Sequence, residues 1–459
     1  MKEIRFDQSY SVDDAGKYVK LPFEVPDGIE RIEVEYDYPR FVEETLSDGT
    51  SRREANIIDL GLYDETGNLY GWSGSNRRSI FTASIAASPG YRRGIIHPGT
   101  WAVALGLYKI ENRLLARVIV RLYRREGKLY RGDLHLHTRN SDGAYTTAQA
   151  IRYSEEAGLD FIALTDHNNL EQNSEIGNPG NSENSGNSGL SVIPGVEFTN
   201  YRGHANFFFP DPVPRFGGDF LVNSFDEMAA LFRRAKDAGA LISINHPFSD
   251  CPWEFGYDNF PFDMIEVWNG PMAGFNLRAV EKWHELLCRG RKITALAGSD
   301  THIHELGRTF GSPCTQVRAE SPAPPALLAA LAAGRCSLAY APRGPHLDLE
   351  IAGAGLGGSV PFRPGLEGRA VVSGARQGDI LKVIHRDGLA QTFTAPFNGV
   401  YRPCFPVEDR SFYRLELYRT LLDQSALCGL SNPVYIGINA SQNDSSDNKY
   451  WPLSAWNEL

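Results

Sequence analysis

Apolar and polar residues alternate with a period of two through the first part of the chain. In "YVKLPFEV", Val19, Leu21, Phe23 and Val25 would lie on one side of an extended strand, and "IERIEVEYDY" repeats the pattern. Turn-forming stretches such as "DETGN" and "HPGTW" separate further strand-like runs. Short alternating strands between frequent turns are typical of an antiparallel sandwich. We therefore assign residues 1–128 to an N-terminal β-sandwich.

The pattern changes after this region, where continuous apolar runs alternate with helical stretches. In "TTAQAIRYSEEAGLDFIALTDHN", Thr146 and Gln149 fit a capping box and Gly158 fits a helix C-cap. The run from Phe161 to Leu164 is apolar throughout, as in a strand buried on both faces. Repetition of such units predicts a parallel sheet or barrel over residues 129–343.

Short strand-like runs return towards the end of the chain. The stretch "DILKVIHRDGLAQTF" predicts a hairpin that turns at Arg386, Asp387 and Gly388, and "FYRLELYR" and "NPVYIGI" follow it. We assign residues 344–440 to a small C-terminal β domain. Residues 441–459, which contain "SQNDSSDNK", are expected to form a polar, mobile tail.

Two segments of the middle region are expected to be loops near its active end. Residues 171–189, "EQNSEIGNPGNSENSGNSG", contain little to bury and predict a flexible excursion over the mouth of the barrel. Deleting residues 174–188 should then change substrate affinity more than stability. The aromatic-rich stretch 248–262 is the second loop expected to contribute to specificity.

Composition narrows the class of protein. A chain of 459 residues favours roughly two to four domains, and 42% apolar with 22% charged residues is typical of a globular protein. A net charge of -10 argues against a nucleic-acid backbone or an anionic membrane as the partner. The start, "MKEIRFDQSY", shows no signal sequence, so we expect a cytoplasmic protein. Six scattered cysteines without a C-x-x-C pair predict buried free thiols.

Histidines and carboxylates are concentrated where apolar runs of the middle region end. In "RGDLHLHT", His135 and His137 are two positions apart and would share one face of a strand. Neutral imidazole is the commonest nitrogen ligand of first-row metals. The residues that come directly after other apolar runs are Asp166, His167, Glu197, His246, Asp300 and His302. Active sites of parallel barrels form at the carboxyl ends of the strands, so these side chains are expected to converge.

Nine residues, some from this set and some close to it in the sequence, are candidate metal ligands. They are His135, His137, Asp142, His167, Glu197, His204, His246, Asp300 and His302. One structural zinc needs about four ligands, so the set predicts two or three divalent ions (Zn, Mn or Fe) that share ligands.

Several residues near these positions have a second interpretation. His204, in "GHANFFF", could belong to a plain strand, and Asp166 could either orient an imidazole or cap a loop. His97, His284, His346 and His385 do not follow an apolar run of the barrel and are expected to be structural, whereas His304 is left open.

The ordered motifs "DLHLHTRNSDG", "GLDFIALTDHN", "IPGVEFT", "NHP", "EVWNG" and "AGSDTH" resemble those of the PHP (polymerase and histidinol phosphatase) superfamily. They are most similar to its carbaryl-hydrolase-like (CehA/McbA) branch, over roughly residues 131–320. The resemblance implies an α/β fold, a distorted (β/α)7 TIM-like PHP barrel, here flanked by N-terminal and C-terminal β domains. It also implies a metal centre that hydrolyses esters, commonly phosphoesters.

The resemblance also implies which residues share each metal. His135, His137, Glu197 and Asp300 would hold the first ion. Glu197 would bridge to a second ion, which His204 and His246 also bind. The third site would consist of Asp142, His167 and His302. Many relatives have a histidine where Asp142 stands, and this chain departs from them there.

These residues predict a metal-dependent hydrolase in which a hydroxide between two cations is the nucleophile. A "GxSxG" motif and a Gly-rich phosphate loop with its lysine are both absent from the sequence. The expected activity is that of a phosphoesterase on a small anionic phosphoester, with Glu197 and Asp300 as catalytic residues. Arg308 is expected to bind the anionic group, unless it is a surface residue that pairs with Glu305 or caps a loop.

Two alternatives to a phosphoesterase stay open. The same metal centre could hydrolyse an amide or a carbamate, or the chain could be a carbohydrate- or partner-binding β-sandwich protein with a barrel that has lost catalysis. The sequence does not indicate the oligomeric state.

Overall fold

The computed structural model describes residues 2–26, 29–46, 49–83, 86–94, 96–124, 127–175, 189–210, 220–305, 307–421 and 423–437. The chain divides into two compact units, Met1–Glu126 and Gly127–Leu459. The expected polar tail lies outside the described residues, and so does most of the expected excursion, 176–188.

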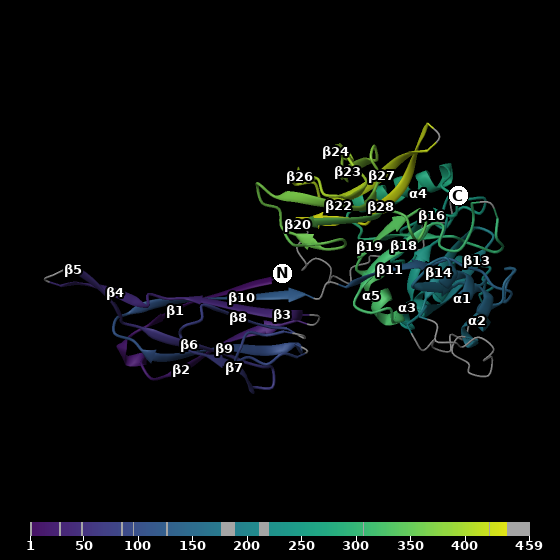
Figure 1. The fold of residues 1–459 in the computed structure, drawn as a ribbon. Helices are drawn as coiled ribbons and strands as arrows, with labels where there is room; N and C mark the ends of the chain where they lie inside the picture. Colours follow the sequence, from purple (N-terminus) through teal and green to yellow (C-terminus); the bar gives the residue numbers. More distant parts are fainter. Residues whose placement is uncertain are drawn as a thin grey trace. The chain divides into compact units, whose positions relative to one another are not determined.

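The first unit consists of antiparallel sheets, two of which form its layers (Figure 1). One sheet has the order β1-β10-β3-β8 and the other β2-β9-β6-β7, while β4 and β5 form a separate hairpin. The predicted alternation is confirmed, because Leu21, Phe23 and Val25 are buried in the core of this unit. The elements are β1 (Lys2–Tyr10), η1 (Val12–Asp14), β2 (Tyr18–Val25), β3 (Ile29–Asp37), β4 (Phe41–Leu46), β5 (Gly49–Glu54), β6 (Ile57–Tyr63), β7 (Leu69–Ser73), β8 (Ser79–Ala83), β9 (Gly99–Lys109) and β10 (Leu114–Arg124).

A mainly parallel sheet forms the centre of the second unit. Its order is β17-β16-β15-β14-β13-β12-β11, with β14 antiparallel to both of its neighbours. A parallel bridge joins Leu136 to Thr301, in the segments that follow β11 and β17. Closure into a (β/α)7 barrel stays a prediction. The strands are β11 (Lys128–Asp133), β12 (Phe161–Leu164), β13 (Ser191–Asn200), β14 (Gly203–Phe208), β15 (Leu241–Ile244), β16 (Met264–Asn269) and β17 (Thr294–Gly298).

Helices pack against these strands, and the local sequence explains where they begin. Thr146 and Gln149 form the predicted capping box of α1, and Gly158, with a φ of +84°, follows its C-terminal end as predicted. Ser224 and Glu227 form a second capping box at α3. Contacts pair α1 with β12, α3 with β15, α4 with β16 and α5 with β18 (Cys314–Ala319). The helices are α1 (Thr147–Glu156), α2 (Glu171–Ser174), α3 (Phe225–Asp237), α4 (Gly274–Cys288) and α5 (Pro324–Ala332).

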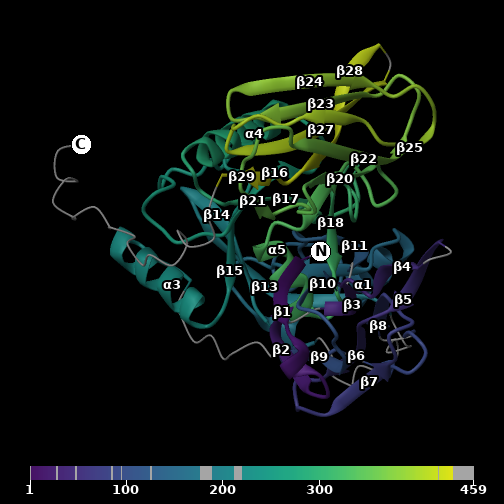
Figure 2. The ribbon, with the colours of Figure 1, turned by 90° about the vertical axis from the view of Figure 1, so that its left-hand side faces the viewer.

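The C-terminal strands continue the central sheet through β11-β18-β19-β28-β27-β23-β24. Figure 2 shows α4 beside this layer, and Phe412 of β27 packs in the same core cluster as Trp283 of α4. The predicted hairpin is confirmed, with His385 opposite Gly388. The strands are β18 (Cys314–Ala319), β19 (Cys336–Ala339), β20 (His346–Ile351), β21 (Ser359–Val360), β22 (Glu367–Ala375), β23 (Ile380–His385), β24 (Gly388–Thr394), β25 (Gly399–Tyr401), β26 (Cys404–Pro406), β27 (Phe412–Leu421), β28 (Gln424–Ser431) and β29 (Val434–Ile436).

One loop prediction needs correction and the other is confirmed in part. The segment 171–174 forms the helix α2, in which the buried side chain of Gln172 donates a hydrogen bond to the carbonyl of Gly195 at 2.9 Å. In the loop 248–262, Trp253 and Phe260 are buried in the same core cluster as residues of α3 and stabilise the fold. Residues 249–251 of this loop line the cavity at the candidate site, as expected of a loop that contributes to specificity.

The cysteines are free, as predicted, but they are not all buried. Cys404 is exposed, and Cys251 and Cys288 are half-buried. Within the described ranges, no helix has the length and apolar character needed to cross a membrane.

Candidate metal centre

Four loops and two strands bring the nine predicted ligands to one place. His135 and His137 follow β11, His167 follows β12, His246 follows β15, and Asp300 follows β17. Parallel strands present their carboxyl ends at the same edge, which explains the convergence. Glu197 is the exception, because it does not end its strand. β13 continues to Asn200 so that it can pair antiparallel with β14, where His204 lies.

Glu197 is the centre of the cluster. Its Oε1 lies 3.1 Å from His135 Nε2, 3.3 Å from His204 Nδ1 and 3.5 Å from His246 Nε2. Its Oε2 lies 2.9 Å from His167 Nδ1 and 3.5 Å from His137 Nε2. One carboxylate therefore faces five imidazoles, with its two oxygens turned to different groups of them.

Asp300 is the second carboxylate of the centre. Its Oδ1 lies 3.1 Å from His137 Nε2 and 3.4 Å from His135 Nε2. Glu197 and Asp300 thus share the two histidines that follow β11. Glu197 approaches these rings from β13, and Asp300 approaches them from the loop after β17.

Asp142 belongs to a third, more open group. Its Oδ1 lies 3.2 Å from His302 Nε2, 3.6 Å from His167 Nε2 and 4.0 Å from His137 Nδ1. The Asp142 side chain is 59% exposed, whereas that of His137 is fully buried. This group is therefore the most accessible to solvent.

The donor atoms fit divalent cations. Three groups have ligand atoms that all lie within 4.8 Å of one another: His135 with His137 and Asp300; His135 with Glu197 and His246; and His137 with Asp142, His167 and His302. Among the described residues, the buried atoms without a hydrogen-bond partner include His135 Nε2, His137 Nε2, Glu197 Oε2 and His204 Nδ1. Buried polar atoms are costly without a partner, and several such atoms around one point are what a cation would satisfy.

Charge at the centre also favours cations. Burial acts to raise the pKa of Glu197, but the imidazoles of His135, His167 and His204 outweigh it and lower this pKa well below its usual range. Asp300 behaves in the same way, since His135 and His137 overcome its burial and lower its pKa. Both carboxylates are therefore charged near neutral pH, in a place from which water is largely excluded.

Three residues that support the ligands were missed from the sequence. Glu266 Oε1 lies 3.0 Å from His135 Nδ1, and Glu266 Oε2 accepts the backbone N–H of His246 at 3.0 Å. Asn245 Nδ2 donates to Glu197 Oε1 at 2.8 Å, and Asn269 Nδ2 donates to Asp300 Oδ2 at 3.2 Å. Partners of this kind fix the ring orientation of a metal-binding histidine and the position of a carboxylate.

Asp166 caps a loop, which is the second of the two roles considered for it in the sequence analysis. Its carboxylate accepts hydrogen bonds from the backbone N–H of Thr138 at 2.7 Å, from the Thr138 hydroxyl at 2.8 Å and from the Ser141 hydroxyl at 2.6 Å. Asp166 therefore caps the loop that carries Asp142. It positions the third group through the backbone instead of through an imidazole.

Two of the candidate metal-binding residues have a strained backbone. His246 has a φ of +24° and Asp300 a φ of +53°, in the left-handed region that such residues seldom adopt. Each amide is held by the cluster itself: His246 N–H donates to Glu266, and Asp300 N–H donates to the carbonyl of His135. Strain of this kind costs about 1–3 kcal/mol per residue and is concentrated at functional sites.

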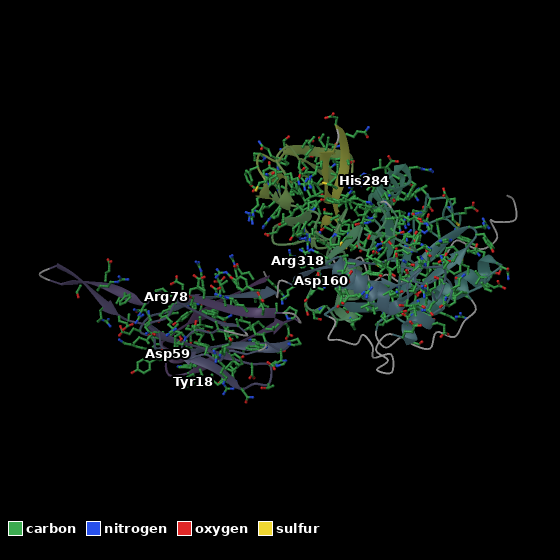
Figure 3. All side chains as sticks on the ribbon, turned by 45° about the vertical axis from the view of Figure 1, so that its right-hand side comes forward. Tyr18, Asp59, Arg78, Asp160, His284 and Arg318 are labelled. Carbon is green, nitrogen blue, oxygen red and sulfur yellow. The ribbon has the colours of Figure 1, made fainter. Side chains whose placement is uncertain are left out.

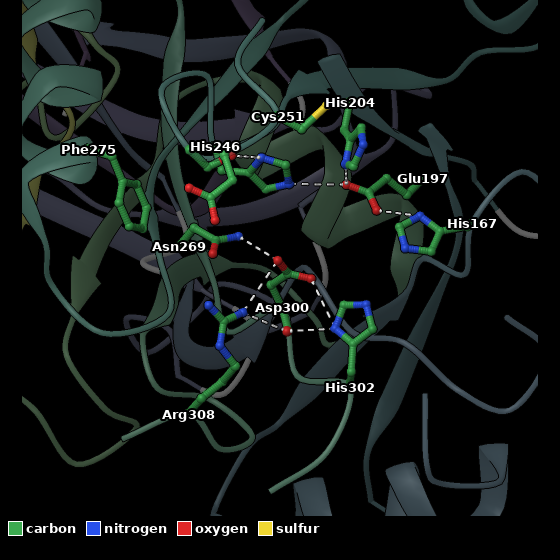
Figure 4. Close-up of a pocket in the computed structure, with 12 residues that line it drawn as sticks. His167, Glu197, His204, His246, Cys251, Asn269, Phe275, Asp300, His302 and Arg308 are labelled. Carbon is green, nitrogen blue, oxygen red and sulfur yellow. Dashed lines mark hydrogen bonds and ion pairs between the residues drawn. The ribbon is translucent and has the colours of Figure 1, made fainter. Parts of the chain in front are cut away.

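A cavity of about 320 Å³ opens onto the centre. Figure 4 shows Glu197 between His204, His246 and His167, and Asp300 between Asn269, His302 and Arg308. Arg308 Nη1 lies 3.4 Å from Asp300 Oδ2 and donates to the carbonyl of Asp300 at 2.8 Å. The Arg308 side chain is thus directed at the cavity, and no ion pair to Glu305 is found within the described ranges.

The remaining histidines lie apart from the ligands. His284, labelled in Figure 3, is on α4, and its Nε2 lies 3.2 Å from the carbonyl of Arg386. His346 contacts Gln316, and His385 packs against Tyr413. His304 packs edge to face against Tyr145 and Phe310. His97 belongs to the first unit, where its carbonyl accepts from Trp101.

Comparison with known proteins agrees with the placement of the site. Residues 133–261 match the family model for the PHP domain, over less than a third of the chain. No curated protein matches the sequence.

Two solved structures have limited similarity to this chain. A two-domain protein from Bacteroides vulgatus ATCC 8482 "containing predicted PHP-like metal-dependent phosphoesterase" is 18% identical, with a TM-score of 0.38, over 67% of this chain and 99% of its own. An amidohydrolase from Chromobacterium violaceum is 17% identical, with a TM-score of 0.30, over 39% of this chain and 89% of its own. The family match shows that residues 133–261 of this chain are similar to the PHP domain.

Proposed function

We propose that this protein is a metal-dependent phosphoesterase that acts on a small anionic ester. The observation that carries the proposal is the convergence of nine histidine and carboxylate side chains around one centre, six of which line a cavity with Arg308 at its wall. The net charge of -10 favours a small substrate over a nucleic-acid backbone.

The three ligand groups allow two or three cations. His135, His137, Glu197 and Asp300 would hold the first, Glu197 with His204 and His246 the second, and Asp142 with His167 and His302 the third. The groups of atoms that lie within 4.8 Å of one another support these assignments in part, since they hold His135 with His137 and Asp300, and Asp142 with His167 and His302, but none includes His204. Divalent cations bound there would lower the pKa of water and withdraw charge from phosphoryl oxygens.

The side chains of the site have separate tasks in the hydrolysis. Glu197 and Asp300 hold their positions through Asn245 and Asn269. Arg308 presents a guanidinium to the cavity, which suits two oxygens of a phosphoryl group. In the reaction the oxygen of water bonds to phosphorus, the bond from phosphorus to the ester oxygen breaks, and the alcohol leaves with a proton.

The competing substrate class is an amide or a carbamate, which the motif resemblance to the CehA/McbA branch keeps open. The two classes differ in charge, and Arg308 is the group that would sense the difference. Its Nη1 contacts the carbonyls of Ser299 and Asp300 and lies 3.4 Å from the Asp300 carboxylate, a long ion pair that compensates its positive charge only in part. This favours the charged substrate.

A substrate panel tests the proposal. Protein loaded separately with Zn, Mn or Fe(II) would be assayed on aryl phosphomonoesters, aryl phosphodiesters, aryl carbamates and anilides. We expect the phosphoesters to have the highest kcat/KM and Glu197→Gln to abolish that turnover. Faster hydrolysis of carbamates or anilides would replace the phosphoesterase with an amidase, and turnover of none by metal-loaded protein would favour a binding protein.

A further inference from the structure

A second cavity, of about 260 Å³, lies between the end of β16 and the C-terminal strands. Trp268 and Met272 come from β16 and the loop after it, Tyr340 follows β19, and Leu427 is on β28. These side chains form an apolar wall. Trp268 and Leu427 are almost completely buried, while Tyr340 is 40% exposed and lies towards solvent.

Two arginines give the same cavity a positive charge. Arg419 is buried and forms a fork with Asp379, at 2.8 Å from Nε to Oδ1 and 2.7 Å from Nη2 to Oδ2. Arg376 also lines the cavity, but its contact with Asp379 is through the backbone N–H, at 2.8 Å. Over the described residues, no carboxylate pairs with the Arg376 side chain. Asp379 thus offsets one of the two positive charges.

The thiol of Cys428 adds no negative charge to this cavity. Burial raises the pKa of Cys428 to about 12, so the thiol stays neutral near pH 7. The cavity therefore combines an apolar wall with one uncompensated guanidinium. Such a site suits an apolar ring that carries a carboxylate.

Gly270 and Arg308 separate the two cavities. Gly270 lines the second cavity, and Arg308 lines the metal cavity. A Cβ on Gly270 would lie 2.9 Å from Arg308 Nη2 and 3.0 Å from Arg308 Cζ, so the guanidinium rests directly on the glycine backbone. Asn269 lines the metal cavity, while its neighbours Trp268 and Gly270 line the second one. The partition is thus a single stretch of chain.

We infer that the second cavity is a subsite for a small aromatic carboxylate, beside the metal cavity and separated from it by the chain at Gly270. The ring lies against Trp268 and Leu427, and its carboxylate lies on Arg376. The C-terminal β strands thereby contribute a ligand site of their own.

Binding of two probes without a scissile bond tests the subsite directly. Isothermal titration calorimetry would compare naphthalene-2-carboxylate with 2-naphthylmethanol, which has the same ring and no charge. We expect the carboxylate to bind about tenfold more tightly, and Arg376→Ala to remove that difference while Arg376→Lys restores part of it. The matched control Arg363→Ala, which changes an exposed arginine outside both cavities, should preserve the difference.

A variant that fills the cavity distinguishes binding inside the cavity from attraction of the carboxylate by the general surface charge. Ala426 lines the cavity and is half-buried, so Ala426→Phe should fill it and weaken binding of both probes. Equal losses in Arg376→Ala and Arg363→Ala, or carboxylate binding that survives Ala426→Phe with the protein folded, would overturn the subsite. Failure of both probes to bind the wild-type protein would also overturn it.

Discussion

The backbone N–H of Asp300 donates to the carbonyl of His135 at 2.8 Å, and Asp300 Oδ1 lies 3.4 Å from Nε2 of the same histidine. The loops after β11 and β17 are therefore joined through both main chain and side chain. Asp300 accepts a φ of +53° in this position. The fold thus holds the Asp300 carboxylate in a strained conformation. A site can be organised in this way before a cation binds to it.

Glu197→Gln is expected to lose most activity and to keep the fold, because it removes the central charge and preserves the shape. We expect kcat to fall at least about a hundredfold and the metal content to decrease. Steady-state kinetics, elemental analysis and circular dichroism measure the three effects. Glu320→Gln, an exposed residue after β18, is the control. Near-normal turnover with full metal content would exclude the bridging role.

Arg308→Ala should raise KM about tenfold for 4-nitrophenyl phosphate and much less for a neutral 4-nitrophenyl carbamate, because only the first carries the charge that the guanidinium recognises. The exposed Arg343→Ala serves as the control for a lost positive charge. Equal losses on both substrates would make Arg308 a structural residue, and no loss on either would place it outside the substrate site.

Gly270→Ala should resemble Arg308→Ala although the arginine is still present. Gly270 has a φ of +55°, and its added Cβ would meet Arg308 Nη2 at 2.9 Å, so the guanidinium must move. We expect KM for phosphoesters to rise, and the free energy of unfolding to fall by about 1 kcal/mol or more. Gly274→Ala, with no atom within 4 Å of the new Cβ, should change neither. An unaltered KM in Gly270→Ala would show that the position of Arg308 is unimportant.

His346, which is not part of the metal centre, should make the free energy of unfolding depend on pH. Burial, with the charges of Arg318 and Arg131, lowers its pKa to about 4, below the usual value near 6.5. The folded protein therefore prefers the neutral ring, and its contribution, up to about 3 kcal/mol, is complete above pH 6.5 and is lost as the pH falls towards 4.

Urea unfolding at pH 7, 5.5 and 4 measures this effect. His346→Gln cannot titrate, so its free energy of unfolding should fall less steeply with decreasing pH than that of the wild type. Parallel curves for the two proteins would show that His346 is not responsible. Groups of the metal centre are the same in both proteins and cancel in the difference.

The sequence predicted those features that depend on short spacings. The capping box at Thr146 and the hairpin at Gly388 are set by neighbours a few residues apart, and both are confirmed. His167, His246 and Asp300 were also predicted, because polar residues at the carboxyl ends of parallel strands meet at one edge of the sheet and this depends only on the direction of the strands. The position of Glu197 inside its strand was not predicted. The apolar run of β13 does not indicate that the strand continues to pair with an antiparallel neighbour, β14.

Residues that act through long-range contacts could not be predicted in this way. Glu266 lies inside an apolar strand and meets His135 across the sheet, and Asn245 reaches Glu197 from another strand end. No periodicity connects such pairs. For Asp166, the adjacent His167 suggested a partner, but the direction of a side chain in a loop depends on the backbone, which here turns the carboxylate to Thr138.

Metal content is the measurement that tests the central claim most directly. Purified protein would be incubated with Zn, Mn or Fe(II), dialysed and analysed by inductively coupled plasma mass spectrometry, together with Asp142→Asn. We predict about two to three tightly bound divalent ions per wild-type chain, and about one fewer in Asp142→Asn, since that carboxylate serves the open group with His167 and His302. Folded wild-type protein that retains no divalent ion after loading would contradict the account.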